Sequence, residues 1–289
     1  MPDKNTSKEL AALINLLDEP DEKAFSHIRE RIFSFGPEAI PDLENARDQN
    51  FEGIVQDRIE FLIKSIRNEI LKNEFIEWIN FGSSDLLKGF LLVTRTQDPE
   101  IDLVNQVVRI EQIKMDAWLE LNDNLTALEN IKVLNHIIFE VHHFEPNRIN
   151  LHAPENSYLN TLLDTKKGSP LSLGMLYIII AQKLNIPVYG VNLPQHFILA
   201  YTTEMVRPHP DENDVLFYIN PFNNGAIFTR KEIELFIHQL KVKPSESFFA
   251  PCTNVDIIKR LLLNLKYSLT QSGNSEKAEE LDNLLTMME

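Results

Sequence analysis

Cysteine, glycine and basic residues are all scarce in this chain. One cysteine in 289 residues can form neither an intramolecular disulfide nor a cysteine-rich zinc site. The 9 glycines are few, and the G-x-G-x-x-G and P-loop patterns that bind phosphates do not occur. Lys and Arg number 28 against 43 Asp and Glu, a net charge of -15. This charge predicts that neither nucleic acid nor an anionic membrane is a partner.

Long hydrophobic runs are also missing. Every apolar stretch is shorter than the roughly 18 residues that a membrane span needs. The first ten residues, MPDKNTSKEL, lack the apolar segment of a secretory signal. H-E-x-x-H, G-x-S-x-G and EF-hand patterns are absent as well. We therefore expect a cytoplasmic protein, with about two domains from its length.

The first 80 residues are predicted to form short amphipathic helices. Apolar residues recur three and four positions apart, as in Leu10, Leu13, Ile14 and Leu17. The segment LINLLDEPDEKAFSHIRERIFSFGPEAIPDL resembles HEAT-type repeats, which implies a HEAT-like helical region over 1–80. Helices continue over 84–144. One of them spans 101–121, and we expect Trp118 on its apolar side.

The pattern after residue 156 predicts an α+β core over 81–240. Ser169 and Pro170 are typical of a helix start, and the apolar residues that follow occupy all sides of the helix, which indicates burial. Gly174 within it predicts a close approach by a neighbouring backbone. Strand-like runs follow over 188–193, 196–201, 215–219 and, shorter, 226–229. Their short connections favour an antiparallel sheet.

The tail returns to helical patterns over 231–240, 255–271 and 276–288. The last two helices are separated only by Ser272-Gly273-Asn274, so they are predicted to form an antiparallel hairpin that is similar to one TPR unit. The predicted domains are thus 1–80, 81–240 and a tail over 241–289. The fold class is α+β and predominantly helical.

One constellation of residues suggests chemistry. Pro170 and Ser172 lie at a helix N-terminus, His196 begins one predicted strand and Asn220 ends another. Cysteine proteases build their sites in this order, since a helix dipole lowers the pKa of a thiol, a histidine accepts its proton and a polar residue orients the histidine.

The segment NSYLNTLLDTKKGSPLSLGMLYIIIAQKLNIPVYGVNLPQHFILAY resembles the core of transglutaminase-like proteins of the bacterial SirB type. The resemblance extends through FYINPFNNGAIF and covers about 84–288. It implies a papain-like core with a TPR-like tail. It also implies that Pro170 stands where active relatives have the nucleophilic cysteine, that His196 matches their histidine and that Asn220 replaces their aspartate. Proline offers no nucleophilic atom.

Two other side chains are candidate nucleophiles. Ser172 lies two residues beyond Pro170, which rotates its side chain about 200° around the helix, and its simplest role is in the first helical turn. Cys252 matches no nucleophile position of the family and is predicted to be an inert thiol. Asn220 suits a turn before Pro221 as well as it suits pairing with His196.

A candidate metal site lies near the middle of the chain. His136 and Glu140 are four residues apart and share a helical face, as metal ligands often do. His142 does not lie on that face, and a bundle site would need more carboxylates. We expect no metal and no cofactor.

The leading functional hypothesis is a non-catalytic transglutaminase-like protein that binds protein partners as an interaction or scaffold module, with a degenerate active-site pocket. Helical-repeat regions on both sides of the core would suit this role. One alternative is a hydrolase or acyl-transferase of the protease or amidase type that uses Ser172, His196 and Asn220. The other is a small-molecule or peptide binder in the same cleft.

Overall fold

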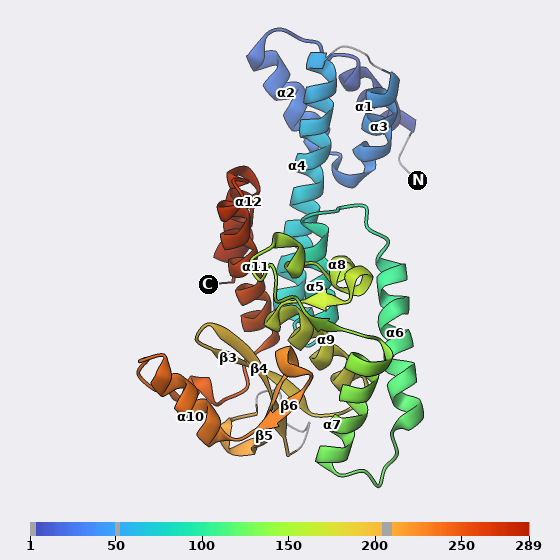
Figure 1. The fold of residues 1–289 in the computed structure, drawn as a ribbon. Helices are drawn as coiled ribbons and strands as arrows, with labels where there is room; N and C mark the ends of the chain where they lie inside the picture. The colour runs from blue at the N-terminus through green and yellow to red at the C-terminus, as the bar shows by residue number, and fades with distance from the viewer. Residues whose placement is uncertain (1–3, 50–52, 204–209, 289) are drawn as a thin grey trace. The chain divides into compact units, whose positions relative to one another are not determined.

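The computed structural model describes residues 4–49, 53–203 and 210–288. The chain divides into two compact units, Met1–Ile76 and Glu77–Glu289. Helices predominate in both, and the strands all lie in the second unit (Figure 1). The predominantly helical fold class with a small sheet is therefore confirmed. None of the helices in the described part of the chain is both long and apolar enough to cross a membrane.

The first unit is a set of short helices followed by a long one. Its elements are α1 (Lys4–Ile14), α2 (Glu22–Phe33), a 3₁₀ turn (Gly36–Ala39), α3 (Ile40–Gln49) and α4 (Gly53–Glu77). Their apolar faces form one core that includes the predicted face of Leu10, Ile14 and Leu17, all buried. Amphipathic patterning thus accounts for these helices, because each has one side to bury.

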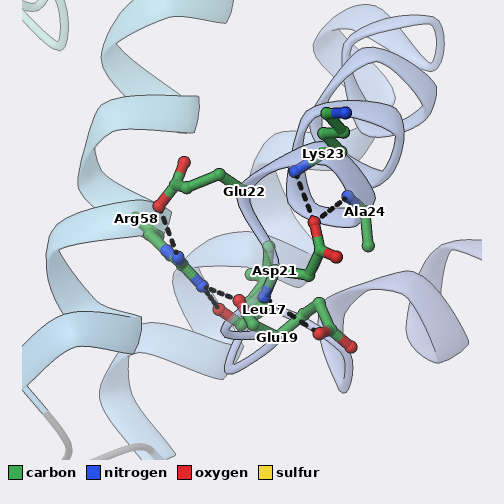
Figure 2. A network of polar contacts seen from close by, with 7 residues as sticks. All are labelled: Leu17, Glu19, Asp21, Glu22, Lys23, Ala24 and Arg58. Atoms are coloured by element: carbon green, nitrogen blue, oxygen red, sulfur yellow. Dashed lines mark hydrogen bonds and ion pairs between the residues drawn. The ribbon is translucent and has the colours of Figure 1, made fainter.

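The turn between α1 and α2 is held by Arg58 of α4 (Figure 2). Its Nη1 donates to the carbonyl oxygens of Leu17 and Glu19, each at 2.8 Å. The same guanidinium lies over the ring of Phe25, 3.9 Å from the centroid. Asp21 then caps α2 by accepting two backbone N–H bonds. Two carbonyls of the connection after α1 are thereby satisfied by a charged donor.

The second unit surrounds one buried helix, α9. Its helices are α5 (Leu86–Arg95), α6 (Leu103–Glu120), α7 (Ala127–Asn135), α8 (Leu159–Thr165), α9 (Pro170–Lys183), α10 (Arg230–Gln239), α11 (Asn254–Gln271) and α12 (Ser275–Thr286), with π-helical turns at Trp78–Gly82 and His136–Val141. Asp85, Asp102 and Thr126 each accept a backbone N–H bond at the start of α5, α6 and α7. These caps explain where the three helices begin.

The main sheet has the order β3 (Val188–Leu193), β4 (His196–Thr202), β5 (Val215–Asn220) and β6 (Ala226–Phe228), and every neighbouring pair is antiparallel. This confirms the predicted strands and their direction. A second pair, β1 (Glu145–Pro146) with β2 (Lys167–Gly168), is parallel and lies in stretches without a strand pattern. Two residues per strand are too few for a periodic signal.

Helix α9 packs against β3 and β4, and nearly all of its residues are buried, as the sequence predicts. Gly174 of α9 and Gly190 of β3 both face the ring of Phe197. A Cβ at Gly174 would lie 2.7 Å from that ring, and a Cβ at Gly190 would lie 2.5 Å from it. The close approach expected at Gly174 is therefore made by an aromatic side chain rather than by a backbone.

The expectation for Trp118 was wrong. Its side chain is 58% exposed, whereas Ile110, Ile113 and Ala117 of the same helix are buried. Helix α6 carries apolar residues on two sides, and only one side packs against α8 and α9. Sequence periodicity shows that a helix has apolar faces but does not say which of two will be covered.

Helices α11 and α12 pack against one another and reverse direction at Gly273, whose φ of +82° suits glycine. Helix α11 also contacts α5, β3 and the 3₁₀ turn Pro154–Ser157. These contacts bring the C-terminal hairpin onto the sheet and helices of the same unit. They position α11 as one wall of the cleft that also includes Pro170 and His196.

Candidate functional site

A cleft of about 520 Å³ opens in the second unit. Four segments line it: the N-terminus of α9, the start of β4, the stretch around Pro154–Ser157, and α11. Two of the predicted site residues, Pro170 and His196, line the cleft, whereas Ser172 and Asn220 do not. Pro170 and His196 therefore share one accessible cavity.

Pro170 is the first residue of α9 and follows a reciprocal cap. The Oγ of Ser169 accepts a bond from the backbone N–H of Ser172 at 3.1 Å, and the Oγ of Ser172 accepts one from the N–H of Ser169 at 2.9 Å. Proline suits this position because it has no N–H to leave unsatisfied. Ser172 is fully buried. Its hydroxyl therefore belongs to the helix cap and has no exposed surface on the cleft.

His196 follows a tight turn in which Gln195 has a φ of +59°. It is the first residue of β4 and pairs with Leu193 of β3. Its ring lies 6.1 Å from the ring of Phe236 in α10. Burial lowers the pKa of His196, the charge of Arg260 lowers it further, and a hydrogen-bonding interaction with Asn220 opposes them. The imidazole is therefore neutral at pH 7 and could accept a proton.

Asn220 is the last residue of β5. The register pairs Leu199 with Ile219, so Asn220 lies diagonally from His196 on the same face of the sheet. Its Oδ1 also accepts the backbone N–H of Phe222 at 3.0 Å. Asn220 thus forms the turn that precedes the 3₁₀ helix Pro221–Asn223 and interacts with His196 as well.

Cys252 lies outside the cleft lining. Burial, and to a lesser degree the charge of Asp256, raises the pKa of its thiol to about 12. Its backbone N–H donates to the carbonyl oxygen of Gly190 at 2.8 Å. A thiol with so high a pKa is almost entirely protonated at pH 7 and is a poor nucleophile.

Two of the histidines near the middle of the chain each lie close to a carboxylate. His136 lies 2.9 Å from Glu140, and His142 lies 2.9 Å from Asp116. Within the described residues, no three His, Cys, Asp or Glu side chains are grouped as metal ligands would be.

Sequence reasoning missed the residues that α11 contributes. Arg260, Asn264 and Tyr267 line the cleft opposite Pro170 and His196. The guanidinium of Arg260 donates to Asn192 Oδ1 at 3.0 Å and lies 5.8 Å from the ring centre of Phe197. The sequence carries no clear signal for this role, because charged residues commonly border the apolar face of a helix.

The fold is an α+β domain in which a helix N-terminus and a strand histidine face one cleft. Residues 105–263 match the family model described as "Transglutaminase-like superfamily". The match covers more than half of the chain and includes Pro170, His196 and Arg260. The chain belongs to the transglutaminase-like superfamily.

Several curated proteins are similar to it. A "UPF0162 protein" of Vibrio cholerae is 25% identical over 195 residues, which cover 66% of this chain and 68% of that protein. "UPF0162 protein YchA" of Escherichia coli is 24% identical over 205 residues, 68% of this chain and 71% of that protein. Human "F-box only protein 21" is 28% identical over 155 residues, 54% of this chain but 23% of that longer protein. No solved structure gives a significant match.

Proposed function

We propose that this chain is a non-catalytic member of the transglutaminase-like superfamily and acts as a protein-interaction module whose cleft is a binding pocket. One observation carries the proposal. The cleft is open and lined by Pro170 and His196, but within the described residues no hydroxyl or thiol hydrogen-bonds to the ring of His196. A base without an adjacent nucleophile cannot start acyl transfer.

The size and lining of the cleft support binding. A volume of about 520 Å³ lies in the range typical of ligand pockets. Polar groups such as Asn264 and Arg260 lie beside apolar ones such as Leu171 and Leu261, which is the usual mixture in such pockets. We also propose that the HEAT-like region before the core and the TPR-like hairpin after it provide further surface for partners.

The alternative is a hydrolase or acyl-transferase that uses Ser172, His196 and Asn220. The interaction of His196 with Asn220 favours it, since such a pair orients a catalytic histidine. The full burial of Ser172 in the helix cap counts against it. A fluorescent fluorophosphonate reacts with activated serines. We expect no labelling, and labelling that Ser172→Ala removes would establish the enzyme instead.

Binding through the cleft is tested by filling it. Asn264 is exposed and lines the cleft, whereas its neighbour Leu263 is exposed and does not. Asn264→Trp should block the cleft without disturbing the core, and Leu263→Trp adds the same side chain on another side of α11. A photo-crosslinking amino acid placed at Asn264 should capture a cellular partner that the same group at Leu263 does not capture.

The two tryptophan variants sharpen the result. We expect Asn264→Trp, and not Leu263→Trp, to abolish the biological activity of the chain in cells. Equal effects of the two variants, or the same crosslinked proteins from both positions, would show that the cleft is not where the partner binds. Thermal unfolding of both variants serves as the control for folding.

A further inference from the structure

The cleft differs in charge from the rest of the chain. The chain contains 43 acidic residues, but none of the described residues that line the cleft is Asp or Glu. The ionisable groups there are Arg260, His152, His196 and Tyr267. Of these, only Arg260 carries a charge throughout the physiological pH range. A positive cavity in a protein of net charge -15 is therefore a local property of this site.

The guanidinium of Arg260 is not neutralised by the protein. Its one hydrogen bond within the described residues goes to the neutral amide oxygen of Asn192, at 3.0 Å. No carboxylate within the described residues forms an ion pair with it, and burial lowers its pKa. Arg260 is half-buried, and charges withdrawn from water are normally paired, because the loss of hydration is costly. A guanidinium has five N–H donors, so several remain for a ligand.

The surroundings of Arg260 favour a ligand with one negative charge. The N-terminus of α9 opens on the same cleft at Pro170, and its dipole adds positive potential. The lowered pKa of His196 leaves that ring neutral at pH 7, so it adds a polar group but no second charge. A single guanidinium matches a carboxylate, whose two oxygens accept its paired N–H groups.

The rest of the lining suits an apolar side chain. Leu151, Pro170 and Leu261 contribute apolar surface, and the ring of Tyr267 is exposed beside them. His152 holds that ring in an edge-on contact, with centroids 5.8 Å apart. An aromatic or branched residue could pack there while its carboxylate reaches α11.

We propose that the cleft binds the free carboxylate at the end of an apolar peptide, with the guanidinium of Arg260 as its partner. The inference rests on the proposed function, since it requires the cleft to be a binding pocket. It adds the class of ligand and the residue that recognises it.

The test compares two peptides that differ only in charge. N-acetyl-leucyl-phenylalanine and its C-terminal amide are titrated into the full chain, and backbone amide shifts of the cleft residues are followed by NMR. We expect the acid to bind about tenfold more tightly than the amide, because a charge-assisted bond is stronger than a neutral one. 3-Phenylpropionate tests whether a small carboxylic acid suffices, and phenyl phosphate tests the other common anion.

Arg260→Gln should abolish the preference for the acid. Lys259→Gln removes the same charge from the next residue of α11, whose Nζ donates to the carbonyl oxygen of Met288 and not into the cleft. This control should retain the preference. Arg260→Lys keeps the positive charge but not the paired N–H donors of the guanidinium, so it should bind the acid with intermediate affinity. This variant also provides the test if Arg260→Gln does not fold.

The outcomes separate this inference from the proposed function. Equal affinity for acid and amide, with both shifting cleft residues, would overturn the carboxylate assignment and leave the binding cleft intact. Tighter binding of phenyl phosphate than of either carboxylate would overturn it in favour of a phosphate ligand. If none of the four compounds shifts cleft residues, the inference is wrong, whereas the proposed function is decided by Asn264→Trp and its control.

Discussion

The two walls of the cleft carry different kinds of residue. One wall, formed by the start of α9 and of β4, holds Pro170 and His196, the positions that the resemblance to active transglutaminase-like proteins marks for catalysis. The other wall, formed by α11, holds Arg260, Asn264 and Tyr267. Within the described residues, no hydroxyl or thiol on the first wall hydrogen-bonds to the ring of His196. The second wall carries a guanidinium that forms no ion pair with a described carboxylate.

This difference shows how chemistry and binding can separate within one cavity. Proline at the first position of α9 fits the helix because it has no N–H to leave unsatisfied, and the cleft is open with it. The polar and charged groups of α11 do not depend on that position. Under the proposed function, the cleft can therefore bind a ligand through α11 without a nucleophile on the other wall.

The largest effect should come from placing a thiol on the first wall. In Pro170→Cys, the thiol lies at the N-terminus of α9 and in the cleft that His196 also lines. The helix dipole favours the thiolate, and the neutral imidazole of His196 is available to accept its proton. At pH 7 we expect it to react with iodoacetamide at least about 100-fold faster than Cys252 in the same molecule, since the pKa of Cys252 is about 12. Mass spectrometry of the digested protein gives both rates.

A surface thiol provides the control for accessibility. Leu263→Cys places a thiol on the exposed side of α11, where it should react at the rate of an ordinary cysteine. If Pro170→Cys reacts no faster than Leu263→Cys, the first wall does not provide the electrostatic setting that activates a thiol. The contrast between the two walls would then be smaller than we infer.

A smaller effect should come from disturbing the packing of Phe197, whose ring lies against Gly174 of α9 and Gly190 of β3. Gly174→Ala and Gly190→Ala would each bring a Cβ within 2.8 Å of the Phe197 ring, which is closer than packing allows. We expect each to lower the free energy of unfolding by about 1–3 kcal/mol through overpacking. Urea denaturation of the full chain measures this loss.

Gly82→Ala is the matched control, because its Cβ would lie 3.4 Å from the nearest atom of Trp78, an ordinary contact. It should leave stability nearly unchanged. Losses of the same size in all three variants would point to a general intolerance of alanine at these glycines. The slot for Phe197 between α9 and β3 would then have no special role in holding the first wall.

The sequence predicted the second unit unevenly, for physical reasons. The four strands of the main sheet and the buried helix were predicted because apolar β-branched runs and a Ser-Pro start are strong local signals. Pro170 and His196 were named because they fall on a family motif. Arg260 was missed because its environment depends on α11 packing against β3 and the 3₁₀ turn Pro154–Ser157, which lie far earlier in the sequence. Trp118 was misplaced because exposure depends on which face of α6 is covered.

The smallest effect concerns the pKa of His196, which both walls influence. Burial lowers it most, the charge of Arg260 lowers it further, and Asn220 raises it. Arg260→Gln should therefore raise this pKa toward 6.5, only in part because burial remains, while Asn220→Ala should lower it. NMR titration of the imidazole carbon-bound protons measures both shifts, and Lys259→Gln should cause neither.

The lowered pKa of His196 determines whether this residue stabilises or destabilises the fold as the pH falls. Because the folded-state pKa lies below the unfolded value of about 6.5, the unfolded chain binds the proton more readily. The contribution of His196 to stability is therefore constant above that value and falls as the pH decreases from it toward the folded pKa. Arg260→Gln should reduce this loss and Asn220→Ala should increase it. A reduced loss in Arg260→Gln would show that the charge on α11 acts on the histidine of the other wall, and an unchanged pH profile in that variant would mean that Arg260 and His196 are electrostatically independent.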